Sequence, residues 1–330
     1  MRIPFVNRNE EIEYLLKLAS QGVRIPLFIY GPEGCGKTRL LEELNSILRS
    51  KNFVSLYIDA KEYSIEQAIR GSSREFVDLL LDIASDITEP FGKVFIKLIS
   101  KIINEYERRY RFKGKKLVLL VDEVVEGIGF ENIERYTKIL YDLANDILDK
   151  FNAESILVIA TTREERSRDI LSRHSYVHLS YLWNLSKDSF EELAKILNSP
   201  IDIIEDLYIY TSGNPRALID IASMNWDVSK WIEMLFRERI ASLLYEDIVI
   251  QHLDELEKVV TDPDNAMRIS SNLRNFLIEK NMIMYLGNPL ISKVKPSKCK
   301  DLGIGDFFAW QMNIYRILIE ERILKTKRNI

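Results

Sequence analysis

The segment GPEGCGKT, residues 31–38, carries glycines, a lysine and a threonine at the spacing Gly-x-x-x-x-Gly-Lys-Thr. Glycine adopts backbone conformations closed to other residues, so consecutive N–H groups of such a loop can point inward at phosphates. Lys37 would reach the β and γ phosphates of a nucleotide, and Thr38 would ligate Mg²⁺. The sequence therefore predicts a site for ATP or ADP with Mg²⁺. The residues expected to contact the nucleotide here are Gly31, Pro32, Gly34, Cys35, Gly36, Lys37, Thr38 and Arg39.

A second pattern supplies the carboxylates that hydrolysis requires. The run KLVLLVDE, residues 116–123, is apolar until it ends in Asp122 and Glu123. Asp122 would hold the metal ion through a water molecule, and Glu123 is placed to orient or deprotonate the attacking water. An acidic end to a buried strand is common by itself. Its combination with the phosphate-binding loop favours ATP hydrolysis.

A third apolar run, SILVIATTR, ends in two threonines and an arginine. Thr161, Thr162 and Arg163 would emerge at the same edge of a sheet, beside the γ phosphate. A threonine there can position water, and an arginine can stabilise negative charge. The predicted catalytic residues are therefore Lys37, Glu123 and Arg163.

A parallel sheet must position these residues. Five short runs of branched or aromatic residues predict buried strands, and helical patterns separate them. This alternation implies a parallel sheet with helices on both faces, an α/β fold of the P-loop NTPase type. The predicted strands span residues 25–30, 53–59, 116–122, 155–161 and 176–182, and the segment 61–112 is expected to hold two or three helices.

After residue 182 the strand patterns stop, and two further domains are predicted. Residues 183–226 indicate a small helical lid, in which Ser186 caps the first helix and a break at Gly213-Asn214-Pro215 separates two others. Residues 227–330 indicate a winged-helix domain, with one helix over residues 246–260 and a second over 269–281. A hairpin is expected to turn at Gly287-Asn288-Pro289. The first domain would then be residues 1–182.

Together these motifs resemble the AAA+/STAND group of P-loop ATPases, most closely the archaeal ATPase family, which is related to the NB-ARC and origin-recognition ATPases. The element PFVNRNEE is similar to one that helps form the adenine pocket in that family, although Asn7 stands where glycine is usual. The resemblance implies that Val6 and Arg8 contact the nucleotide. It also implies that Arg163 senses the γ phosphate.

The resemblance extends into the predicted lid and beyond. The Gly-x-Pro element of the STAND lid corresponds to Gly213 and Pro215, and its proline is implied to approach the nucleotide. Arg216 follows directly and could act as a sensor from the lid. The segment LGIGDFFAWQMNIYR, residues 302–316, resembles one that often follows the winged helix, and no chemistry is assigned to it.

The sequence gives less information about the partner of such an ATPase than about its nucleotide site. Residues 268–300 contain seven basic side chains opposed only by Glu279, and such clusters bind phosphate backbones. Asn272 and Arg274 could reach base edges of double-stranded DNA. The basic residues are Arg268, Arg274, Lys280, Lys293, Lys295, Lys298 and Lys300.

Two functional classes remain open. In the first, the chain is an ATP-driven switch that acts on DNA or nucleoprotein. In the second, it is a signalling or scaffold ATPase whose winged helix binds protein, with slow or partner-stimulated turnover. A small-molecule kinase is disfavoured, because a lid and a winged helix have no role in it. An arginine from a neighbouring subunit, with Arg166 or Arg168 as candidates, could complete the site in a homo-oligomer.

Composition limits the remaining classes. The net charge of −4 excludes a polycation built to coat nucleic acid, and two distant cysteines argue against a disulfide framework. The first residues lack the apolar core of a signal peptide, and no apolar run is long enough to span a membrane, so we expect a cytoplasmic protein. His174, His178 and His252 lack metal-binding spacing.

Overall fold

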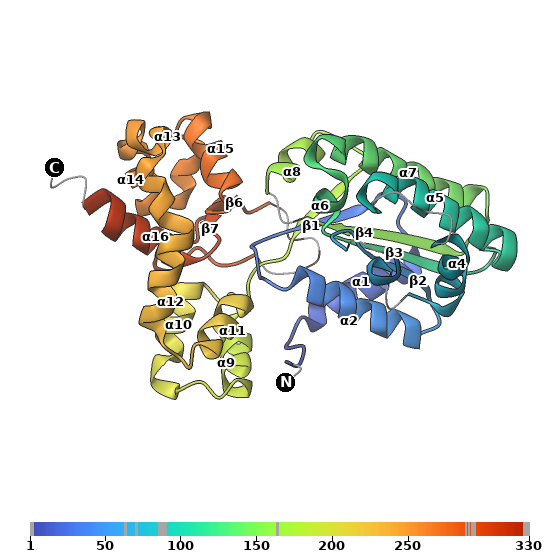
Figure 1. Ribbon diagram of the computed structural model, residues 1–330, viewed down its shortest axis with the longest axis horizontal. Helices are drawn as coiled ribbons and strands as arrows, with labels where there is room; N and C mark the ends of the chain where they lie inside the picture. Colours follow the sequence, from blue (N-terminus) through green and yellow to red (C-terminus); the bar gives the residue numbers. More distant parts are fainter. Residues whose placement is uncertain are drawn as a thin grey trace.

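The computed structural model describes residues 3–62, 65–69, 72–84, 91–162, 165–287, 289, 291 and 295–325. Two bodies lie side by side in it (Figure 1). One is built on a parallel sheet, and the other consists of helices with a small two-stranded sheet. Within the described ranges, no helix combines the length and apolar character needed to cross a membrane.

The sheet of the first body contains the five predicted strands, all parallel, in the order β2-β3-β4-β1-β5. The strands are β1 (Leu27–Tyr30), β2 (Val54–Asp59), β3 (Lys116–Asp122), β4 (Ser155–Thr161) and β5 (His178–Tyr181). Because they run in one direction, their carboxyl ends meet at one edge of the sheet. The sequence motifs of the predicted site follow β1, β3 and β4 and therefore converge at that edge.

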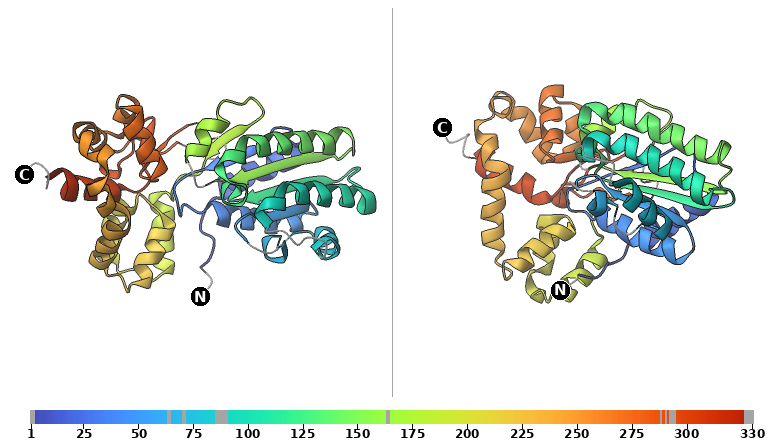
Figure 2. Two further views of the ribbon diagram at one scale, coloured as in Figure 1. Left: turned by 45° about the horizontal axis from the view of Figure 1, so that its top comes forward. Right: turned by 45° about the vertical axis from the view of Figure 1, so that its right-hand side comes forward.

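Alternating side chains of the strands enter two separate hydrophobic cores. Leu119 and Val121 of β3 join a cluster with helices α4, α5 and α7, whereas Val118 and Leu120 join one with α1 and α2. Figure 2 shows the sheet between these helical layers. The helices of this body are α1 (Asn9–Gln21), α2 (Lys37–Ser50), α3 (Ile65–Ala68), α4 (Arg74–Ala84), α5 (Phe91–Tyr110), α6 (Val124–Ile128), α7 (Ile133–Asp149) and α8 (Glu165–Leu171). The predicted P-loop NTPase type of α/β fold is confirmed, and so are the helices within 61–112.

The helical body has one main hydrophobic core. Most buried apolar side chains between Leu185 and Leu324 belong to a single cluster, which Val6 from the N-terminal segment joins. Residues on both sides of the predicted boundary at 226/227 therefore pack together. Met284 and Ile304 instead pack in a small cluster with Tyr30 and Tyr181 of the sheet body. The elements are α9 (Lys187–Ile196), α10 (Ile204–Thr211), α11 (Pro215–Ser223), α12 (Val228–Leu235), a π-helical turn (Phe236–Ile240), α13 (Asp247–Gln251), α14 (Leu253–Thr261), α15 (Ser271–Glu279), β6 (Ile283–Tyr285), β7 (Phe308–Trp310), α16 (Asn313–Leu318) and a second π-helical turn (Ile319–Leu324).

Side chains cap several helices of the helical body, and the cap at Ser186 was predicted. The Ser186 side chain accepts a hydrogen bond from the Ser189 N–H at the start of α9, and the Ser270 side chain accepts one from the Leu273 N–H at the start of α15. Asn214 caps α11 through the Ala217 N–H, and Pro215 occupies its first turn. The break between α10 and α11 is therefore both predicted and observed.

One prediction for the last hundred residues is wrong, and another falls largely outside the described residues. The helix expected over 246–260 is divided at His252 into α13 and α14. The expected hairpin turn at Gly287–Pro289 does not join the paired strands, because β6 pairs antiparallel with β7 in the segment 302–316. Asn288 of that turn and residues 290 and 292–294 of the expected second arm lie outside the described residues, so the hairpin stays a prediction. The winged-helix character of this region stays a prediction.

Candidate nucleotide-binding site

The phosphate-binding loop connects β1 to α2, as its chemistry requires. Gly34 and Gly36 have φ values of +81° and +103°, a region that strains other residues. A Cβ atom on Gly36 would meet no atom within 4 Å, so the loop has an open concave side there. Helix α2 begins at Lys37, directly after the loop, and directs the positive end of its dipole at this space. The loop is therefore shaped to hold an anion.

Lys37 lies across the loop. Its Nζ donates hydrogen bonds to the carbonyl oxygens of Gly31 at 2.9 Å and Pro32 at 3.2 Å, and the residue is buried. These bonds fix the ammonium group at the mouth of the loop, where phosphate oxygens would meet it. The two carbonyl groups thus hold the positive charge of Lys37 beside the loop.

A cavity of about 170 Å³ lies beside the loop and brings separate motifs together. Lys37 and Thr38 line it from α2, Glu123 lines it from the end of β3, and Arg216 lines it from α11. Cations and a carboxylate at one cavity suit phosphate binding and water activation. The complete lining is Gly34, Gly36, Lys37, Thr38, Arg39, Glu42, Glu123 and Arg216.

Asp122 and Glu123 have different surroundings although they are adjacent. The Asp122 carboxylate is fully buried and accepts hydrogen bonds from the Thr161 hydroxyl and from the Tyr57 hydroxyl at 3.3 Å. The Glu123 N–H donates to Thr161 Oγ1 at 2.9 Å. Burial, followed by the charge of Asp122, raises the pKa of Tyr57, so its hydroxyl stays protonated and donates. Thr161 therefore bridges the two acidic residues, whereas we expected its hydroxyl to face the phosphates.

The oxygen atoms at the cavity fit a magnesium ion held mainly by phosphates and water. Thr38 and Glu123 line the cavity, whereas Asp122, which accepts a hydrogen bond from Thr161, is not among the lining residues. In the part of the chain that the structure describes, no three His, Cys, Asp or Glu side chains form a metal-binding group. Magnesium needs no such cage, because it keeps several waters and uses one or two protein ligands beside the phosphates.

A second, more apolar cavity of about 520 Å³ adjoins the first. It lies between the N-terminal segment, the phosphate loop and the lid helices, and its size is typical of a small-molecule site. Gly34, Gly36, Arg39 and Arg216 line both cavities, so the two form one path. The complete lining is Ile3, Pro4, Phe5, Val6, Arg8, Gly34, Cys35, Gly36, Arg39, Leu185, Leu193, Pro215, Arg216, Ile219 and Asp220.

Arg8 ties the N-terminal segment to this site. Its guanidinium donates to Glu11 at 3.0 Å, to the Cys35 carbonyl at 3.1 Å and to the Trp183 carbonyl. The preceding Asn7 has a φ of +56°, which explains why glycine is usual there and why asparagine, which tolerates this conformation, replaces it. Arg8 therefore holds the wall of the apolar cavity in place.

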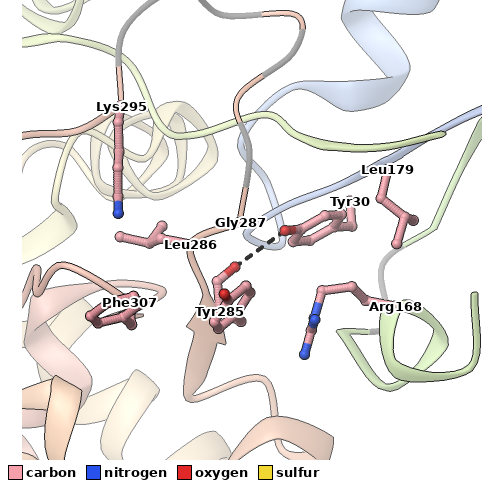
Figure 3. A pocket seen from close by; sticks show the side chains of 8 residues that line it. All are labelled: Tyr30, Arg168, Leu179, Tyr285, Leu286, Gly287, Lys295 and Phe307. Carbon is pink, nitrogen blue, oxygen red and sulfur yellow. Dashed lines mark hydrogen bonds between the residues drawn. The ribbon is translucent and has the colours of Figure 1, made fainter. Parts of the chain in front are cut away.

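The structure leaves two predicted arginine roles without support. Arg163 lies outside the described residues, and the side chain of Arg166 is not described either. Arg168 pairs with Asp169, and its guanidinium lies 4.5 Å from the ring centre of Tyr285 in a cavity shared with the helical body (Figure 3). A role for Arg168 at a neighbouring subunit would require it to leave these contacts.

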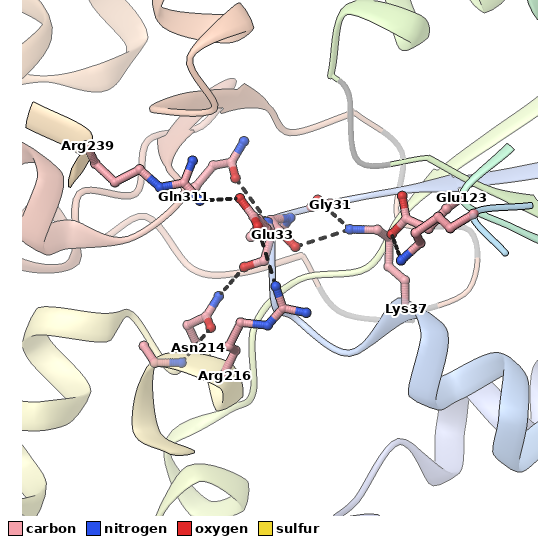
Figure 4. Close-up of polar contacts among 11 residues, drawn as sticks. Gly31, Glu33, Lys37, Glu123, Asn214, Arg216, Arg239 and Gln311 are labelled. Atoms are coloured by element: carbon pink, nitrogen blue, oxygen red, sulfur yellow. Dashed lines mark hydrogen bonds and ion pairs between the residues drawn. The ribbon is translucent and has the colours of Figure 1, made fainter. Parts of the chain in front are cut away.

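The sequence did not identify Glu33, Arg239 and Gln311 as site residues. Figure 4 shows them joined around the phosphate loop, where Arg239 and Gln311 both contact Glu33. Gln311 belongs to the segment 302–316, whose resemblance to a family segment was the one available signal. Arg239 has no sequence pattern that distinguishes it from other surface arginines.

Comparison with known proteins agrees with this geometry. A family described as an ATPase domain predominantly from Archaea matches residues 5–221. An uncharacterized ATP-binding protein of Methanocaldococcus jannaschii is 26% identical over 98% of this chain and 84% of its own length. A second such protein from that organism is 23% identical over 88% of this chain and 92% of its own length.

A relative from another organism and a solved structure also match. An uncharacterized ATP-binding protein of Pyrococcus horikoshii is 22% identical over 88% of this chain and 95% of its own length. A structure of the replication initiator DnaA bound to AMPPCP and single-stranded DNA covers 84% of this chain and 78% of its own, with 18% identity and a TM-score of 0.42. Because the family match spans most of the residues, this chain belongs to the family of ATPase domains found predominantly in Archaea.

Proposed function

We propose that this protein is a magnesium-dependent ATPase that works as a molecular switch, in which the bound nucleotide sets the orientation of the helical body. The observation that carries the proposal is the pair of adjoining cavities between the sheet and the helices. The apolar cavity suits a nucleobase, and the smaller cavity with Lys37 suits phosphates. A ligand that fills both would hold the two bodies together.

The proposed reaction transfers the γ-phosphoryl group of ATP to water. Glu123 takes a proton as the water oxygen bonds to the γ phosphorus, and the bond from that phosphorus to the bridging oxygen of ADP breaks. Lys37 and Arg216 stabilise the charge on the phosphate oxygens, with Arg163 as a proposed third cation. Mg²⁺, when bound near Thr38, would neutralise charge on the β and γ phosphates, and Asp122 would hold it through water.

The proposed moving unit includes both the lid, residues 183–226, and the C-terminal domain, residues 227–330. Their shared core from Leu185 to Leu324 supports movement as one body rather than two. When the γ phosphate leaves, its interactions with Lys37 and Arg216 end, and a different angle between this body and the sheet becomes favourable. The energy of ATP would thus be used to reposition the C-terminal helices.

The surroundings of the basic stretch 268–300 bear on the choice of partner. Lys280 pairs with Glu246, Lys298 pairs with Asp264 and Asp306, Lys295 donates to the Asp306 carbonyl, and Arg274 donates to the Ala266 carbonyl. Arg268 and Lys300 are exposed, and Lys293 lies outside the described residues. DNA or nucleoprotein remains the proposed partner. Because four of these cations already make contacts within the chain, a scaffold ATPase that binds protein is kept as the alternative.

The proposal is tested by nucleotide binding to the wild-type protein and to Lys37→Ala. Wild type should bind ATP with Mg²⁺ and hydrolyse it slowly, because the loop and Glu123 share one cavity. The variant should lose at least about tenfold in ATP affinity, since it lacks a charge-assisted contact to phosphate worth about 1.5–3 kcal/mol. Calorimetric titration measures this, with Lys17→Ala on α1 as the control. Undiminished ATP affinity in Lys37→Ala would contradict the phosphate site.

A further inference from the structure

Glu33, the third residue of the phosphate loop, is contacted by four side chains from the helical body (Figure 4). Its carboxylate accepts hydrogen bonds from Arg239 at 2.8 Å and from Arg216 at 3.4 Å. Its backbone N–H donates to Gln311 Oε1 at 3.1 Å, and its carbonyl oxygen accepts from Asn214 Nδ2 at 2.8 Å. One residue of the loop therefore joins the lid, the turn after α12 and the segment after β7.

The two arginines on Glu33 differ in ways that suggest different roles. The Arg216 side chain is 55% exposed, has the longer contact and lines both cavities of the nucleotide site. The Arg239 side chain is 41% exposed, has the shorter contact and lines neither cavity. Burial alone would lower the pKa of Arg239, but the Glu33 carboxylate raises it. Arg216 can therefore exchange partners within the site, whereas Arg239 remains with Glu33.

We propose that Glu33 is a positioning residue that couples nucleotide state to the helical body through Arg239. The phosphates of bound ATP draw Arg216 away from Glu33, because paired hydrogen bonds between a guanidinium and a phosphate are stronger than one long contact to a carboxylate. The Glu33 carboxylate then bonds to Arg239 more strongly, which tightens the turn Phe236–Ile240 onto the loop. This inference rests on the proposed function, since it needs ATP at the loop.

The coupling must act in both directions. If ATP strengthens the contact between Glu33 and Arg239 more than ADP does, that contact must favour ATP over ADP by the same factor. Removing Arg239 should therefore reduce the preference for ATP, although the side chain lines no part of the nucleotide cavities. A residue with a merely structural role would change both affinities equally or not at all.

The test is the ratio of the ADP and ATP dissociation constants in Arg239→Ala. The ratio should fall about three- to fivefold, because a partly exposed ion pair contributes a free energy of that size to the preference for ATP over ADP. In wild type, the hydrogen-exchange rate over residues 236–245 should differ between the ATP-bound and ADP-bound states, and in Arg239→Ala this difference should disappear. Arg237→Ala is the matched control, because Arg237 lies in the same turn, is more exposed and pairs with Glu233. This control should keep the wild-type ratio.

Two further variants separate the coupling from a loss of structure. Arg239→Lys retains the positive charge and should restore most of the preference for ATP. Glu33→Gln combined with Arg239→Ala should lower the ratio no further than Arg239→Ala alone, because the two residues act through one contact. A wild-type ratio in a folded Arg239→Ala protein would overturn the coupling while the proposed function stands. A wild-type protein that binds no ATP would overturn both.

Discussion

At the residue scale, Asp122 and Glu123 have distinct surroundings because the backbone turns between them. Asp122 ends β3 with its carboxylate fully buried against Thr161 and Tyr57. Glu123 has a φ of +52°, which is uncommon for a residue with a side chain and is found at functional sites. That turn leaves Glu123 only 4% exposed and yet on the wall of the phosphate cavity. Of the two carboxylates, only Glu123 lines that cavity, which supports its proposed role in activating water.

Glu123→Gln should keep ATP binding and lose hydrolysis. The amide has nearly the shape of the carboxylate but cannot take a proton, so turnover should fall about 10²–10⁴-fold. Phosphate release under saturating ATP measures the loss, and titration with ATP measures the retained affinity.

Glu42 offers the control for this prediction. It is another carboxylate lining the same cavity, but it pairs with Arg39 and is more exposed. Glu42→Gln should retain most of the activity. If Glu42→Gln abolished turnover and Glu123→Gln did not, the base would be Glu42 and the assignment of Glu123 would be wrong.

At the element scale, the phosphate loop and the lid meet at Gly34. A Cβ atom there would lie 2.6 Å from Arg216 Cβ and 2.9 Å from Asn214 Oδ1, both at the start of α11. The close approach is what allows Asn214 to reach the Glu33 carbonyl. Position 34 therefore requires glycine for two reasons: the loop needs a positive φ there, and the lid leaves no room for a side chain.

Gly34→Ala should displace the lid, whereas Gly36→Ala should not. Both glycines have positive φ, so both variants carry backbone strain of about 1–2 kcal/mol. At Gly36 an added Cβ meets no atom within 4 Å, so Gly36→Ala shows the effect of backbone strain alone. Without nucleotide, hydrogen exchange over α11 should increase in Gly34→Ala and stay near wild type in Gly36→Ala. Equal exchange in the two variants would show that contact at Gly34 does not hold the lid.

Elements with local causes could be predicted from the sequence, and those with distant causes could not. The strands β1 to β5 follow from runs of apolar residues, and the phosphate loop follows from glycines next to a helix start. The start of strand β7 is held instead by Asp264, which lies more than forty positions earlier in the sequence. Its carboxylate accepts hydrogen bonds from the N–H groups of Asp306, Phe307 and Phe308. No pattern near Gly287 could report that partner.

The same distinction applies to the site. Lys37, Thr38 and Glu123 were predicted because each lies within a short motif that carries its own chemistry. Glu33 and Arg239 are 206 positions apart, and their contact exists only because the helical body packs against the loop. The fully buried position of Asp122 likewise depends on Tyr57 and Thr161 from neighbouring strands.

At the scale of the whole molecule, the placement of α15 bears on the partner. This helix, expected to read DNA, packs beside α8 of the sheet body. Asn272 at its start is exposed, whereas Arg274 is half-buried. A change in the angle between the two bodies would alter what α15 contacts. Binding of a partner at α15 should therefore depend on whether ATP or ADP is present.

Binding to duplex DNA across a series of salt concentrations distinguishes the two partner classes. Each phosphate contact contributes about −0.9 to the slope of log affinity against log salt. If the exposed Arg268 and Lys300 contact phosphates, the double variant Arg268→Ala/Lys300→Ala should reduce that slope by about 2. Lys230→Ala/Arg237→Ala removes the same charge from exposed positions outside the basic stretch and should leave the slope unchanged. An equal reduction of the slope in both double variants would mean that net charge alone attracts DNA. An absence of DNA binding at low salt with ATP would favour a protein partner. The reason is that a basic surface that contacts DNA must bind it more tightly as the salt concentration falls.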